Sequence, residues 1–127
     1  MTTVLLVDDE KLVLRSLEKT LLRAGFYVIT ALDCKSGSEI FTQNRDKVEI
    51  AVLDLNMLGF DGTPKSGAGL DLQADLKKQK PSLPVVILTA YDEVTKAKEA
   101  VSGGASAFIV KGREQGLVEL IQKILNV

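Results

Sequence analysis

The chain has 127 residues, of which 46% are hydrophobic and 26% charged, and its formal net charge is −1. These values fit one compact domain, residues 1–127, with a hydrophobic core. A nearly neutral chain has no basic field for nucleic acid, and apolar runs such as Val4–Val7 are far shorter than the roughly 20 residues of a membrane span. The N-terminal segment has no signal-peptide pattern and Cys34 has no second cysteine to pair with, so we expect a cytoplasmic protein.

Short apolar runs predict five strands, each buried on both faces of a parallel sheet. The strands are expected at Val4–Val7, Phe26–Ala31, Val48–Leu55, Val85–Thr89 and Ala107–Val110. Apolar residues at three- and four-residue spacing predict a helix after each strand. The helices are expected at Lys11–Ala24, Ser36–Asn44, Leu70–Lys80, Asp92–Val101 and Glu114–Asn126. This alternation predicts an α/β fold, a doubly wound (βα)5 three-layer sandwich around a five-stranded parallel sheet.

The segment Met57–Gly69 separates the third strand from the third helix. It is rich in glycine and contains Pro64. Because glycine and proline interrupt regular structure, we expect an irregular loop that is longer than the usual strand-to-helix connection.

Polar residues stand where the predicted strands end. Asp8 and Asp9 follow the first strand and Asp54 lies at the end of the third. Thr89 ends the fourth strand and Lys111 follows the fifth. In an open α/β sheet the ligand site lies at the carboxyl ends of the strands, so these side chains should converge. Clustered carboxylates repel one another, and Mg²⁺, which prefers oxygen ligands and bridges to phosphate, would neutralise them.

The sequence contains no histidine, which excludes histidine general bases, Ser-His-Asp triads and imidazole zinc sites. Carboxylate, hydroxyl and amine chemistry remains, and a carboxylate nucleophile can form an acyl phosphate. Each residue also has a structural interpretation: the acids as a helix cap or loop acids, Thr89 as a strand-end hydroxyl, Lys111 as a solvated lysine. Their convergence at one sheet edge favours the functional hypothesis.

Four segments occur in the order and spacing of the receiver domains of two-component response regulators, which the chain resembles over essentially its whole length. They are VLLVDDE, VLDLNM, VVILTAYD and GASAFIVKG. The resemblance implies a flavodoxin-like, CheY-like fold and a phosphoacceptor signalling domain, with no output domain expected in this chain. Such a domain assists its own phosphorylation and is not an enzyme that turns over a separate substrate.

The resemblance also implies a metal site beside the phosphoacceptor. Asp54 would accept the phosphoryl group and bind the metal. Asp9 would be a direct Mg²⁺ ligand and Asp8 a metal-site carboxylate that acts partly through water. Asn56 would offer its backbone carbonyl to the metal.

Three further residues would act on the phosphoryl group or respond to it. Thr89 would bond a phosphoryl oxygen, and Lys111 would pair with the phosphoryl group and with Asp54. Phe108 would be the aromatic residue that follows Thr89 in the switch.

The partners implied by the resemblance are a sensor histidine kinase or a phosphotransfer protein, and an output protein or domain. The output partner would contact the face built from Asp92–Val101, Ala107–Val110 and Glu114–Asn126. Homodimerisation is left open, and neither a membrane nor nucleic acid is expected as a direct partner.

Two alternative functions remain at this point. The first is a pseudo-receiver, a protein–protein interaction scaffold that keeps the fold without being phosphorylated. The second is a magnesium-dependent phosphohydrolase, which would need an acid two residues after Asp54, where Asn56 stands.

Some positions depart from the family pattern. Gly112 and Leu58 stand where the family usually has proline, and the loop after Leu58 is longer than usual. Phe108 lacks the hydroxyl of the more common tyrosine. We expect these differences to affect the local backbone and the switch more than the phosphorylation chemistry.

Overall fold

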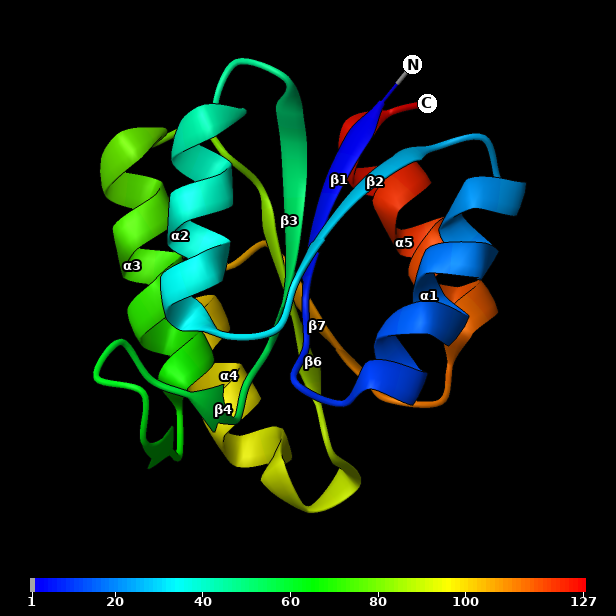
Figure 1. Cartoon of the computed structure of the whole chain (residues 1–127). Coiled ribbons are helices and arrows are strands. Elements are labelled where there is room, and N and C mark those ends of the chain that lie inside the picture. The colour runs from blue at the N-terminus through cyan, green and yellow to red at the C-terminus, as the bar shows by residue number, and fades with distance from the viewer. Residues whose placement is uncertain (1) are drawn as a thin grey trace.

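A central parallel sheet organises the molecule (Figure 1). The structure is a computed structural model that describes residues 2–127, including their side chains except those of Tyr91 and Glu114. The strands of the sheet are β1 (Thr3–Val7), β2 (Tyr27–Ala31), β3 (Val48–Asp54), β6 (Val85–Thr89) and β7 (Ala107–Val110). Their order is β2-β1-β3-β6-β7, and every neighbouring pair is parallel. The chain therefore reverses its winding direction between β1 and β3, which is where such sheets bind ligands.

Helices cover both faces of the sheet, as Figure 1 shows. They are α1 (Lys11–Arg23), α2 (Cys34–Gln43), α3 (Ala68–Gln79), α4 (Val94–Ser102) and α5 (Glu114–Leu125). Alternate residues of β1 point to opposite faces: Leu5 packs in the core beneath α2, α3 and α4, whereas Leu6 packs in the core beneath α1 and α5. The predicted doubly wound α/β fold is confirmed. Within residues 2–127, no helix has both the length and the apolar character needed to cross a membrane.

Several helix ends differ from the predicted ones. Helix α2 begins at Cys34 rather than Ser36, because Asp33 caps it and accepts a hydrogen bond from the Ser36 amide at 2.8 Å. Helix α4 begins at Val94, after a short 3₁₀ turn at Tyr91–Glu93. Such differences at helix ends arise from local hydrogen bonds that hydrophobic spacing does not report.

The expectation of an irregular loop over 57–69 is wrong in two respects. The strands β4 (Met57–Leu58) and β5 (Pro64–Lys65) form a small antiparallel ribbon in this segment, and α3 starts at Ala68, two residues before the predicted Leu70. The turn of the ribbon is closed by a hydrogen bond from the Gly59 amide to the Thr63 carbonyl at 2.8 Å. We call residues 57–66 the insert ribbon.

Candidate functional site

The carboxyl ends of the strands bring the predicted polar residues together at one edge of the sheet. Asp8 follows β1, Asp54 ends β3, Thr89 ends β6, and Lys111 follows β7. The relative exposures of Asp8, Asp54 and Thr89 are 0%, 3% and 0%. Burying polar side chains this deeply costs free energy that core packing does not offset, so their burial indicates a functional site.

The ammonium group of Lys111 lies among three carboxylates. Its Nζ is 2.7 Å from Glu10 Oε1, 3.1 Å from Asp8 Oδ2 and 3.2 Å from Asp54 Oδ1. The predicted pairing of Lys111 with Asp54 is therefore present as an ion pair. Through this one charged group, Lys111 connects the carboxyl ends of β1, β3 and β7.

Four acidic residues could together hold a cation. Asp8, Asp9, Glu10 and Asp54 each offer a carboxylate oxygen, and these oxygens all lie within 4.8 Å of one another. Glu10 is not among the site residues predicted from the sequence, although it directly follows the acid pair. Glu10 reaches the site because its side chain turns toward Lys111, a residue far away in the sequence.

The electrostatics of the site favour a bound cation. Burial, reinforced by the nearby Asp8 charge, raises the pKa of Asp54 to about 8, although Lys111 opposes this shift. Burial also raises the pKa of Asp8. Among the described residues, Asp54 Oδ2 is buried without a hydrogen-bond partner. A hard cation would satisfy this oxygen and relieve the repulsion between the two carboxylates.

The pKa of Lys111 is also raised, but by its acidic partners rather than by burial. Burial alone would lower its pKa, but the hydrogen bond to Glu10 and the charges of Asp54 and Asp8 outweigh burial and raise the pKa. Lys111 is therefore a permanent positive charge beside Asp54.

The two residues expected to form the switch lie on neighbouring strands. Phe108 of β7 is paired in register with Ile87, two residues before Thr89 on β6, so both side chains point to the same face of the sheet. Phe108 is half-buried and packs against the core beneath α2, α3 and α4. The hydroxyl of Thr89 donates to the neighbouring Ala90 carbonyl at 3.1 Å.

The segment after Asp54 is anchored to the start of α3. The Asn56 side chain accepts a hydrogen bond from the Gly67 amide at 2.8 Å, and the Gly69 amide donates to the Leu55 carbonyl at 2.9 Å. Lys96 of α4 donates a hydrogen bond to Ser66 at the end of the insert ribbon. Lys65 of the insert ribbon also pairs with Asp71 of α3, so the insert ribbon is connected to both α3 and α4.

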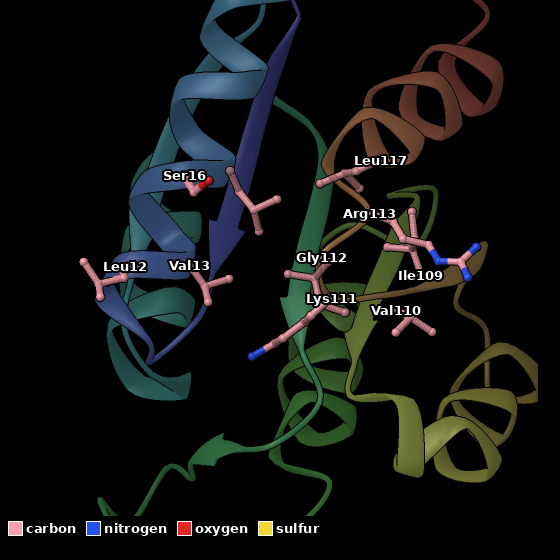
Figure 2. Close-up of a pocket in the computed structure, with 11 residues that line it drawn as sticks. Leu12, Val13, Ser16, Ile109, Val110, Lys111, Gly112, Arg113 and Leu117 are labelled. Carbon is pink, nitrogen blue, oxygen red and sulfur yellow. The ribbon is translucent and has the colours of Figure 1, made fainter.

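A groove of about 260 Å³ lies next to Lys111, between α1 and the segment that joins β7 to α5. Figure 2 shows Leu12 and Val13 of α1 on one side, with Ile109 and Leu117 lining it from β7 and α5.

Gly112 has φ 96°, a left-handed conformation. Proline has φ fixed near −65°, so the proline usual at this position in the family could not adopt this backbone.

Comparison with known proteins adds an independent observation. The family model described as the response regulator receiver domain matches residues 4–124. The chain is 36% identical over 109 residues to the transcriptional regulatory protein GlrR of Escherichia coli (strain K12). That match covers 85% of this chain and 22% of GlrR, so the chain spans less than a quarter of this relative's length.

Solved structures have the same fold. A response regulator receiver domain protein from Clostridium thermocellum has a TM-score of 0.88 and 29% identity, with coverage of 99% of this chain and 95% of that chain. The CheX-CheY-BeF3-Mg²⁺ complex from Borrelia burgdorferi has a TM-score of 0.84, covering 98% of this chain and 89% of that chain. The identity to this second structure is 21%, so the likeness concerns the fold alone.

Proposed function

Because the chain belongs to the family of response regulator receiver domains, we propose that it is the phosphoacceptor domain of a two-component phosphorelay and that Asp54 accepts the phosphoryl group. The observation that carries this proposal is the state of the Asp54 carboxylate. It is buried, one oxygen lies 3.2 Å from Lys111 Nζ, and the other has no hydrogen-bond partner within the described part of the chain. A carboxylate that has one oxygen paired with a cation and the other without a hydrogen-bond partner is arranged to act as a nucleophile.

Mg²⁺ is the proposed cofactor, bound by Asp8, Asp9, Asp54 and the backbone carbonyl of Asn56. The carboxylate oxygens of the three acids lie close enough together to share one ion, and oxygen is the ligand atom that Mg²⁺ prefers. When bound, Mg²⁺ would neutralise the charge on the phosphoryl oxygens. The Borrelia burgdorferi complex, whose fold this chain shares, contains Mg²⁺ together with BeF3.

The proposed reaction moves a phosphoryl group from a phosphohistidine of a partner kinase or phosphotransfer protein to Asp54. The phosphorus–nitrogen bond of the donor breaks, a phosphorus–oxygen bond to the carboxylate forms, and the histidine nitrogen takes up a proton. Lys111 and Thr89 would each contact a phosphoryl oxygen, so this chain contributes positioning and charge rather than a proton transfer. Hydrolysis by water later restores the carboxylate and releases inorganic phosphate.

The output of the domain would be a shift between two conformations, since the phosphoryl group changes the equilibrium only by binding one of them better. Thr89 and Phe108 are placed to respond because they share one face of adjacent strands. The output partner would contact the surface formed by α4, β7 and α5, where β7 is an edge strand of the sheet. On this proposal the domain modifies itself and turns over no separate substrate.

The test is phosphorylation by a small donor. The protein is incubated with Mg²⁺ and acetyl phosphate, and intact mass spectrometry measures phosphoryl addition to the wild type, to Asp54→Asn and to Asp46→Asn, an exposed aspartate used as the control. We expect one added group on the wild type and on Asp46→Asn, and none on Asp54→Asn. Two negative results would together favour the pseudo-receiver scaffold. The first is that the wild type gains no phosphoryl group, and the second is that it shows no Mg²⁺ binding that Asp9→Ala abolishes.

A further inference from the structure

The Lys111 ammonium group already has three carboxylate partners in this structure, and it donates hydrogen bonds to two of them, Glu10 and Asp8. An ammonium group has three N–H donors, and three carboxylates surround this one. Figure 2 shows the Lys111 side chain extending away from the end of β7, in the direction opposite to that of the neighbouring Arg113. A phosphoryl group on Asp54 that needs Lys111 must therefore displace one of its present contacts.

The three carboxylates differ in their exposure to water. The side chains of Asp8 and Asp54 are 0% and 4% exposed, whereas that of Glu10 is 60% exposed. A buried carboxylate that loses its cation is left unpaired at a high cost, but an exposed one is hydrated by water. Glu10 is thus the partner that Lys111 can release most easily, even though their contact, at 2.7 Å, is the shortest of the three.

Helix capping does not account for the orientation of the Glu10 side chain. It occupies the N-cap position of α1, yet within the described structure its side chain makes no capping hydrogen bond. Its backbone amide donates to Asp8 Oδ1 at 2.9 Å, and this bond would survive replacement of the side chain. The side chain crosses to Lys111 instead of capping its own helix.

We propose that Glu10 is a positioning residue that holds Lys111 in the resting state and releases it when a phosphoryl group arrives on Asp54. This inference rests on the proposed function. Glu10 then opposes the phosphorylated state, because its ion pair with Lys111 must break. Partly exposed ion pairs are weak, so removal of the contact should strengthen binding of a phosphoryl mimic by about two- to fivefold.

Two substitutions separate this contact from a simple effect of charge. Glu10→Gln removes the charge. Glu10→Asp keeps the charge, but its side chain is one methylene shorter and should lengthen the 2.7 Å contact with Lys111. Calorimetry would measure the affinity for beryllofluoride at a fixed Mg²⁺ concentration, and nitrogen NMR of the Lys111 ammonium would report whether its environment has changed. Glu18→Gln, further along α1, is the control for the loss of one acidic charge.

We expect both Glu10 variants to bind beryllofluoride about two- to fivefold more tightly than the wild type, to shift the Lys111 ammonium signal and to keep the wild-type urea midpoint. Glu18→Gln should behave as the wild type does. Tighter binding by Glu10→Gln alone would mean that charge is responsible, and unchanged or weaker binding in both variants would overturn the role of the contact. Failure of the wild type to bind beryllofluoride would instead reject the proposed function, and this inference with it.

Discussion

Gly69 lies so close to the backbone of Asp54 that no side chain fits between them. A Cβ atom at position 69 would lie 2.3 Å from the Asp54 carbonyl oxygen and 3.0 Å from Leu55 Cα. The first turn of α3 therefore rests directly on the segment that carries the proposed phosphoacceptor. A displacement of this segment must also move α3.

Gly69→Ala should consequently destabilise the protein and disturb the site. Because the clash is with backbone atoms, either α3 or the Asp54 segment must shift, and overpacking of this kind costs about 1–3 kcal/mol. Urea denaturation would measure the free energy of unfolding, and calorimetry the Mg²⁺ affinity, which should fall. Gly59→Ala is the matched control, since its Cβ would meet Lys65 at an ordinary 3.5 Å. Equal stability of the two variants would contradict the close approach.

The stability of the metal-free protein should decrease as the pH rises. The pKa of Asp54 is about 8 in the folded state, raised chiefly by burial, and an aspartate in an unfolded chain has a pKa of about 3.9. Between these two values the folded state binds more protons than the unfolded state, so the free energy of unfolding falls as the pH increases. Asp54 alone accounts for a slope of at most about 1.4 kcal/mol per pH unit.

Asp54→Asn removes this titration and is the comparison that isolates it. Urea denaturation of both proteins between pH 5 and pH 8, roughly the window that the two pKa values define, should give a stability difference that changes with pH. Mg²⁺ binds the ionised carboxylate, so the stabilisation that Mg²⁺ confers on the wild type should increase over the same range. A pH-independent difference between the two proteins would contradict the raised pKa.

Asn56 should have separable structural and metal-binding contributions. Its side chain holds the Gly67 amide at 2.8 Å, whereas the proposed metal ligand is its backbone carbonyl. Asn56→Ala should therefore lower the free energy of unfolding by about 0.5–1.5 kcal/mol and speed proteolysis of the insert ribbon, yet retain Mg²⁺ binding. Asp9→Ala should instead lose Mg²⁺ binding while the free energy of unfolding and the proteolysis of the insert ribbon stay close to those of the wild type. Loss of Mg²⁺ binding in a folded Asn56→Ala protein would contradict this division of roles.

Cys34 should be unreactive in the folded protein. Burial, aided by nearby acidic groups, raises the pKa of its thiol from 9.0 to about 11, and Sγ donates to the Ala68 carbonyl at 3.3 Å. The lower thiolate fraction alone should slow the reaction with a disulfide reagent by about a hundredfold relative to the urea-unfolded chain. Absorbance of the released thiol would measure the rate. Similar rates in the folded and unfolded protein would show that Cys34 is accessible.

Much of the fold and the location of the site could be predicted from local sequence patterns. Short apolar runs such as Val85–Thr89 and helical spacing of leucines in α1 identify their elements because burial on a regular backbone imposes a period. The polar residue at each strand end then locates the site, because parallel strands present their carboxyl ends at one edge. Asp8, Asp54, Thr89 and Lys111 meet there as predicted.

Other features depend on contacts between segments that no local pattern connects. The carboxylate nearest to the Lys111 ammonium group is that of Glu10, which lies 101 positions away in the sequence. Glycine is required at position 69 because the Asp54 backbone passes beside it. The insert ribbon forms where glycine content predicted an irregular loop: its flanking residues Asn56 and Gly67 are hydrogen-bonded to each other, and Ser66 at its end accepts a hydrogen bond from Lys96 of α4. Periodicity and composition describe a residue's neighbours along the chain, whereas these ion pairs, close approaches and anchoring bonds exist only after the strands and helices have packed in three dimensions.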